Sequence, residues 1–218
     1  MATSTVGFIG GTGPEGRGLA LRFALAGLTV MIGSRDEERA NAAVEKIAGS
    51  APPGSITGAL NEAVAAETDT VFIAVPYTGQ RPTLASLAPT LTGKLVVTVV
   101  APVSFEAGVA TALPVPEGSA ALEAAALLPN ATVAAAFHNV AARDLLRPEA
   151  SVDSDVFVFS DDTQATADVA DLTRLIPGAR AIDGGGLVNA RYAEDLTALL
   201  MNINRIHKAH TSIRITGL

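Results

Sequence analysis

Residues 6–16, VGFIGGTGPEG, decide the fold of this 218-residue chain. The apolar run at residues 6–9 has the length and composition of a buried strand. Gly11, Gly13 and Gly16 follow it with the spacing G-x-G-x-x-G, and a helical pattern of apolar residues starts directly afterwards. In a strand–loop–helix unit, the first glycine makes the tight turn, the second admits a pyrophosphate and the third lets the helix pack on the strand. The stretch therefore predicts a dinucleotide-binding loop.

The remaining loop residues suit the same role. Pro14 fits the first helical turn, where its missing N–H costs nothing, and the helix N-terminus offers free N–H groups to phosphates. We expect Thr12, Pro14 and Glu15 to bind the cofactor together with the three glycines. The alternative is a glycine-rich turn that holds no ligand.

Apolar runs alternate with helical patterns along the rest of the chain. Such runs are typical of a parallel sheet buried on both faces. We predict an α/β fold, a Rossmann-like, doubly wound, mostly parallel sheet with a small C-terminal part. Strands are expected at residues 6–9, 28–32, 71–75, 95–100, 131–136, 156–159 and 179–182, and helices at 36–48, 79–91, 117–128, 163–175 and 187–208.

The pattern weakens around residues 139–153, which suggests a boundary. We predict an NADP-binding domain at 1–139 and a smaller part at 140–218 that closes the site and contributes to a dimer. The chain has no cysteine, which excludes disulfides, thiol catalysis and cysteine-based metal sites. We expect no metal site. The formal net charge of −7 argues against nucleic acid as a partner.

The chain also shows no sign of membrane insertion or export. It contains no run of 18 apolar residues, and its N-terminus lacks the basic start of a signal peptide. We expect a cytoplasmic protein without a membrane partner.

The end of the second strand indicates which dinucleotide binds. Ser34, Arg35 and Arg39 stand where an NAD site would carry an acidic residue. A hydroxyl and two guanidinium groups suit a 2′-phosphate, so we predict NADP(H). The alternative is that both arginines pair with Asp36 and Glu38 on a solvated surface.

Further candidates follow other strands, at the edge where parallel strands end. They are Val75 and Pro76, then Ala101, Pro102 and Val103, then His138 and Asn139. Each proline leaves a carbonyl edge free for a nicotinamide, or simply ends its strand. His138 has the chemistry to hydrogen-bond a ring carbonyl, although a structural histidine is the alternative.

Several blocks together resemble the NADPH-dependent reductases of the deazaflavin coenzyme F420. These blocks are residues 10–13 (GGTG), 33–35 (GSR), 55–58 (SITG), 101–104 (APVS), 137–139 (FHN), 189–197 (NARYAEDLT) and 213–217 (IRITG). The resemblance implies reversible hydride transfer between C4 of NADP(H) and C5 of the deazaflavin, which stacks over the nicotinamide.

The resemblance also implies roles for particular residues. It places His138, Arg191 and Thr197 beside the deazaflavin as the catalytic set. Asp195 departs from the family pattern, in which a serine is expected. Ser55 and Thr57 either contact the deazaflavin or belong to a plain turn.

Two other functions remain open at this point. One is an NADPH-dependent dehydrogenase or imine reductase acting on another small substrate. The other is a non-catalytic protein that senses NADP(H). We expect a homodimer. A basic cluster at Arg205, His207, Lys208, His210 and Arg214 either attracts the deazaflavin tail or contacts a second subunit.

Overall fold

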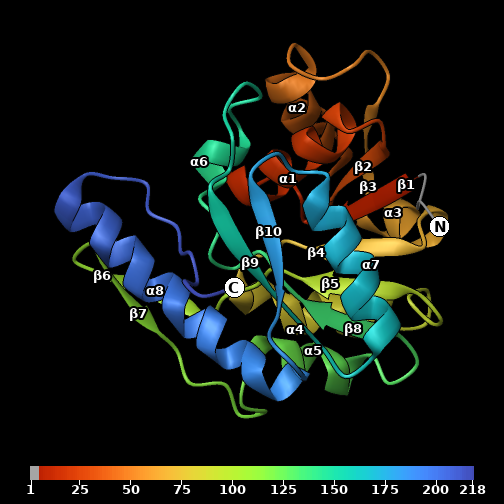
Figure 1. Ribbon diagram of the computed structural model, residues 1–218. Coiled ribbons are helices and arrows are strands. Elements are labelled where there is room, and N and C mark those ends of the chain that lie inside the picture. Colours follow the sequence, from red (N-terminus) through yellow and green to blue (C-terminus); the bar gives the residue numbers. More distant parts are fainter. Residues whose placement is uncertain (1–4) are drawn as a thin grey trace.

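The computed structural model describes residues 5–218 and shows a twisted sheet covered by helices on both faces (Figure 1). Residues 1–4 lie outside the described residues. They belong to the N-terminal stretch in which we expect no signal peptide. The strands are β1 (Thr5–Ile9), β2 (Thr29–Ser34), β3 (Ile56–Leu60), β4 (Thr70–Ile73), β5 (Leu95–Thr98), β6 (Val103–Glu106), β7 (Val109–Ala112), β8 (Thr132–Ala135), β9 (Ser154–Ser160) and β10 (Ala179–Asp183). The helices are α1 (Pro14–Leu25), α2 (Glu37–Ala48), α3 (Asn61–Glu67), α4 (Tyr77–Leu87), α5 (Ala120–Leu127), α6 (Ala142–Leu145), α7 (Thr163–Arg174) and α8 (Ala190–His207), with a 3₁₀ turn at Leu187–Asn189.

The predicted fold class is confirmed. The main sheet has the order β10-β9-β8-β5-β4-β1-β2-β3, and the segment from β3 to β8 is parallel throughout. The chain reverses its winding direction between β1 and β4, where the register pairs Phe8 with Phe72. Ligands of doubly wound sheets bind at such a reversal, beyond the carboxyl ends of the strands.

Two apolar layers hold the helices on the sheet. The layer under α1, α2 and α7 contains stacked rings of Phe8 and Phe72, whose centroids lie 4.9 Å apart, with Phe23 and Phe137 beside them. The layer under α3, α4, α5 and the start of α8 is built from small aliphatic residues. Both faces are buried, which explains why the strands read as continuous apolar runs.

Three strand regions differ from the sequence prediction, and the helices α3 and α6 are also unpredicted. Residues 56–60 form an edge strand, β3, where we expected a loop. Residues 103–112 form an unpredicted hairpin, β6–β7, which lies along α8 at one side of the sheet (Figure 1). β9 runs antiparallel to β8. β3, β6 and β7 have four or five residues each and lie at the edge of the main sheet or outside it, where the alternation of apolar and polar residues is weak. The apolar run of β9 predicts a strand but does not indicate its direction.

The C-terminal part contributes β9 and β10 to the same sheet. The division of the chain into two domains at residue 139/140 stays a prediction. A continuous sheet joins the two parts across this boundary through the β8–β9 pair. The hairpin is attached to α8 by Asn202, whose side chain accepts from the Ala110 N–H at 2.9 Å and donates to the Ala110 carbonyl at 2.7 Å.

The glycines of the loop give a stability prediction. A Cβ added at Gly16 would lie 2.6 Å from the Gly11 Cα, whereas one added at Gly13 would meet no atom within 4 Å. Gly16→Ala should therefore lower the free energy of unfolding by about 1–3 kcal/mol through overpacking. Gly13→Ala, the matched control, should change it by less than about 0.5 kcal/mol. Denaturant unfolding of both variants measures this, and equal losses would contradict the packing role of Gly16.

Candidate functional site

Two cavities open beyond the carboxyl ends of the parallel strands. The large cavity has a volume of about 510 Å³ and the small cavity about 310 Å³. Pro76, directly after β4, lines both. The predicted loop divides between them, with Thr12 in the small cavity and Pro14 and Glu15 in the large one. A ligand bound across the loop would therefore reach from one cavity into the other.

The small cavity brings together Ser34, Arg35 and Arg39 at the end of β2, and Val75 lies opposite them. Asp36 accepts a hydrogen bond from the Arg39 backbone N–H at 3.2 Å and so caps α2. Within residues 5–218 neither arginine makes an ion pair, so the alternative of pairing with Asp36 and Glu38 is not what the structure shows. Both guanidinium groups are available to an anion.

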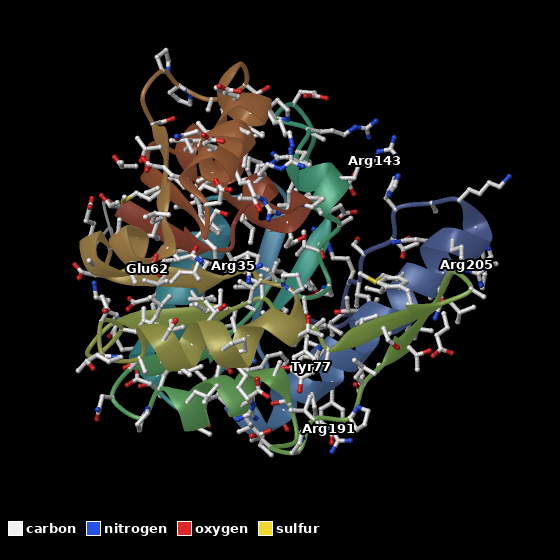
Figure 2. All side chains as sticks on the ribbon, turned by 180° about the vertical axis from the view of Figure 1, so that it is seen from behind. Arg35, Glu62, Tyr77, Arg143, Arg191 and Arg205 are labelled. Atoms are coloured by element: carbon white, nitrogen blue, oxygen red, sulfur yellow. The ribbon has the colours of Figure 1, made fainter. Side chains whose placement is uncertain are left out.

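Sequence reasoning missed several residues of the small cavity, among them Asn61 and Glu62. The Asn61 side chain accepts from the Gly10 N–H at 3.1 Å and fixes a turn in which Gly10 has a φ of 69°. Glu62 is the sole carboxylate among the described residues that line this cavity, and Figure 2 labels it together with Arg35. Both residues start α3, a helix that the sequence pattern did not predict.

The large cavity is mainly apolar and is lined from five parts of the chain, one of which is the Pro76–Tyr77 segment between β4 and α4. Ala101 and Val103 come after β5, and α8 contributes Thr197, Leu200 and Met201. The segment after β8 and the N-terminus of α1 supply the polar groups described next. Mainly apolar walls with a few polar groups are typical of sites for planar ligands.

His138 has an unusual backbone environment. Phe137, just before it, is fully buried and has a φ of 67°, a left-handed conformation that is rare for a bulky residue. The Thr197 hydroxyl lies 2.9 Å from the His138 carbonyl oxygen and 3.0 Å from that of Ala193, and donates between them. The turn directs His138 to the large cavity, and α8 holds it there.

Among residues 5–218, no group hydrogen-bonds to either nitrogen of the His138 ring. Burial lowers the pKa of His138 to about 4, so the imidazole is neutral at physiological pH. A neutral imidazole donates from one nitrogen and accepts at the other. The ring therefore offers a ligand one donor and one acceptor.

Two neighbours in the large cavity also carry unpartnered buried atoms. Glu15 Oε1 has no partner, and burial raises the pKa of Glu15 to about 8. The Asn139 amide donates to the Asp155 carbonyl at 2.6 Å, while its Oδ1 accepts nothing. Buried polar groups normally find partners. A ligand with several polar ring atoms fits this set.

The structure does not bring every predicted residue to the cavities, and four of them lie elsewhere. Arg191 is exposed at the start of α8, with its guanidinium carbon 5.5 Å from the Tyr192 ring centroid. Ser55 and Thr57 lie at the amino end of β3, opposite the ligand edge. Pro102 is buried, and its carbonyl accepts from Leu113 N–H at 2.8 Å to start the hairpin.

Gly11, Gly13 and Gly16 line neither cavity. Gly11 and Gly16 act through packing, because a Cβ on Gly11 would lie 2.6 Å from that of Phe8. Tyr77 and Arg143 line the large cavity although sequence reasoning assigned them no contact there. His210, one of the predicted basic cluster, lines it as well. The signal at Tyr77 was its position next to Pro76, whereas nothing in the sequence marks Arg143.

Within residues 5–218, no group of three or more histidine, cysteine or acidic side chains is arranged to hold a metal ion. In the same residues, no helix is both long enough and apolar enough to span a membrane.

Comparison with known proteins agrees with this geometry. Residues 5–102 match the family model described as NADP oxidoreductase, coenzyme F420-dependent. The F420-dependent NADP reductase of Methanothermobacter thermautotrophicus is 42% identical, over 98% of this chain and 95% of the relative. A crystal structure from Arthrobacter sp. FB24, whose title names an F420-dependent NADP reductase, has a TM-score of 0.83 at 27% identity and covers 99% of this chain and 100% of its own. A reductive aminase from Aspergillus terreus shares the fold alone, with a TM-score of 0.61 at 18% identity over 95% of this chain and 63% of its own.

The free guanidinium groups of the small cavity give a first prediction about binding. Arg35→Ala should weaken NADPH binding about tenfold or more and leave NADH binding unchanged, because a charged hydrogen bond to phosphate contributes about 1.5–3 kcal/mol. Dissociation constants measured by nicotinamide fluorescence test this. Equal losses for both dinucleotides would contradict a 2′-phosphate site at Arg35.

Glu15 gives a prediction about pH. Its pKa is raised, so it is neutral below about pH 8 and negative above. The negative form repels a pyrophosphate, so NADPH affinity should fall as the pH rises through about 8. Glu15→Gln cannot ionise and should bind NADPH with a nearly constant affinity from pH 6.5 to 9.5. A parallel decline in both proteins would assign the titration to another group.

Proposed function

The chain belongs to the F420-dependent NADP reductase family, and on this premise we propose that it transfers a hydride reversibly between NADP(H) and the deazaflavin coenzyme F420. The observation that carries the proposal is the pair of cavities meeting at Pro76. The small one presents free arginines, and the large one is mainly apolar with three polar side chains that carry buried atoms without a partner among residues 5–218. A dinucleotide and a second planar ring would meet where the cavities join.

The residues of the loop and of α2 hold the dinucleotide in this proposal. The N–H groups at the start of α1 face the pyrophosphate, and Gly13 leaves room for it because nothing occupies its missing Cβ position. Arg35 and Arg39 bind the 2′-phosphate, and Ser34 adds a hydroxyl at the same end of β2. Val75 and Pro76 place the nicotinamide end at the junction with the large cavity.

The bound pair supplies its own chemistry, since a hydride passes from the nicotinamide C4 to the deazaflavin C5 and a proton completes the reduced ring. The protein supplies position, which accounts for most of the acceleration when two rings stack in contact. His138, neutral and without a protein partner, donates a hydrogen bond to a deazaflavin ring carbonyl. Thr197 acts through His138 by holding its carbonyl, so it is a positioning residue.

The two other functions receive less support from the site. Dehydrogenases and imine reductases of related fold use a lysine or aspartate as proton donor, and neither residue type occurs among the described residues lining the two cavities. A protein that only senses NADP(H) needs no second ligand site, yet the large cavity has the volume of a second ligand site. Both alternatives remain distinguishable by experiment.

The deciding experiment mixes the protein with NADPH and oxidised F420 and follows the visible absorbance of the deazaflavin. Bleaching at a rate proportional to enzyme concentration is expected. Tight NADPH binding without bleaching would instead favour the sensor. Loss of the NADPH absorbance with an imine or keto substrate, while F420 stays oxidised, would favour a dehydrogenase or imine reductase acting on another small substrate.

His138→Ala tests the assigned role of that side chain in the same assay. It should lower kcat for F420 reduction about tenfold to a hundredfold, because one hydrogen bond to developing charge is lost. NADPH affinity should change less than threefold, since the ring faces the large cavity. Unchanged turnover would remove His138 from the site.

We further propose a homodimer formed by the outer face of α8. Tyr192, Leu199 and Ile206 are 66%, 55% and 62% exposed. Together with Leu196 and Ile203 they form an apolar stripe with alternating spacings of four and three residues, which is the spacing of the contact positions in a two-helix coiled coil. A second copy of the same helix, related by two-fold symmetry, would bury this stripe against its own. A single-subunit mass in solution at micromolar concentration would contradict it.

We also propose that the enzyme works in the cytoplasm, where NADP(H) is available. Fractionation of cells that produce the protein tests this location. Recovery of the protein outside the cytoplasmic fraction would contradict it.

A further inference from the structure

Two basic side chains meet at the rim of the large cavity. Arg143 lies on α6 and His210 lies in the segment that follows α8, and both line the cavity. Arg143 Nη1 is 3.0 Å from His210 Nε2. Figure 2 shows Arg143 on α6, on the side of the molecule where the chain leaves α8, while Arg191 lies far from it at the other end of that helix.

This pair has no carboxylate to neutralise it. Within residues 5–218, Arg143 makes no ion pair, whereas Arg81, Arg174, Arg180 and Arg214 each pair with an acid. Arg143 can only donate, so His210 Nε2 accepts from it and the ring proton lies on Nδ1. Most of the guanidinium fork is left for an anion, which it binds in a planar, two-pronged manner.

The position of Arg143 is fixed from beneath by a second arginine. Arg22 of α1 is 2% exposed, and its guanidinium donates to the carbonyls of Asp144 at 2.6 Å and Leu145 at 2.8 Å. These bonds hold the carboxyl end of α6 against α1. The backbone that carries Arg143 is therefore in place before any ligand arrives, which reduces the entropy lost on binding.

The position of His210 is fixed as firmly. The next residue, Thr211, donates to Asn204 Oδ1 from its backbone N–H at 2.6 Å and from its hydroxyl at 2.8 Å. Further along, Arg214 and the Ile215 N–H bind the fully buried carboxylate of Asp155 at 2.9 and 2.6 Å. The segment after α8 is thus attached to β9 on one side and to α8 on the other.

These contacts divide the basic cluster at the end of the chain. Arg214 already neutralises acids, and Arg205, His207 and Lys208 line neither cavity. Only His210 of the cluster reaches the large cavity, and there it meets Arg143. The anion site is therefore built from two distant segments, and it lies at the mouth of the large cavity, where both side chains are exposed.

We propose that Arg143 and His210 form an anion subsite that binds the phosphate in the side chain of the deazaflavin. The proposal rests on the proposed function, which puts the ring of this substrate deep in the large cavity. With the dinucleotide in the small cavity, the charged side chain of a ring held beside Pro14 and Pro76 reaches solvent through the mouth, where Arg143 and His210 lie. Arg143 binds the phosphate oxygens by its fork, and His210 adds a ring N–H.

The test compares two fluorescent ligands, complete F420 and the deazaflavin nucleoside that has the same ring without the phosphate or glutamates. Arg143→Ala should raise the Kd for F420 about tenfold or more, as expected for a lost charged hydrogen bond. It should leave the Kd for the nucleoside and for NADPH within twofold. His210→Ala should give a smaller loss in the same direction, and added salt should weaken F420 binding less in Arg143→Ala than in the original protein.

Arg205→Ala is the matched control, an arginine of the same cluster outside the cavity, and should leave every Kd unchanged. Unaltered F420 affinity in Arg143→Ala, or equal losses for F420 and the nucleoside, overturns the subsite while leaving the proposed function in place. If the original protein binds neither deazaflavin, the proposed function and the subsite both fail. Unfolding curves of the variants, expected to match, separate binding loss from instability.

Discussion

The backbone contact between Gly11 and Gly16 is the constraint on which the site depends. No side chain fits between them, so α1 packs directly on the end of β1 and its N-terminus points beyond the sheet. This places unpaired N–H groups at the position where the winding of the sheet reverses. Both cavities open at that position, and their shared wall at Pro76 follows from the register of β1 with β4.

The large cavity combines a rigid sheet edge with elements that arrive from the second half of the chain. The strained backbone at Phe137 is held by its aromatic neighbours on one side and by the bond from Thr197 to the next carbonyl on the other. Strain of this kind persists only where the surroundings fix it. The result is a set of polar atoms at His138, Glu15 and Asn139 that have no protein partner and face a mainly apolar space.

Part of this arrangement was accessible from the sequence because it is local. The apolar runs gave the parallel strands, and the glycine spacing gave the loop. Arg35 and Arg39 were found because they stand one helical turn apart, directly after β2. The β6–β7 hairpin and the role of Arg143 could not be predicted, since short edge strands and a four-residue helix show no clear hydrophobic period. A resemblance in sequence does not say which side of α8 a residue occupies, and the structure places Arg191 on the exposed side.

The sequence by itself determined the class of fold, the dinucleotide loop and the charge available to a 2′-phosphate, because each depends on residues that are neighbours along the chain. The tertiary structure decided which distant groups meet. Only folding brings Arg143 within 3.0 Å of His210, buries His138 without a partner and neutralises Arg214 with Asp155. Burial and pairing set the charge and the hydrogen-bonding capacity of a side chain, and both are properties of its surroundings in space.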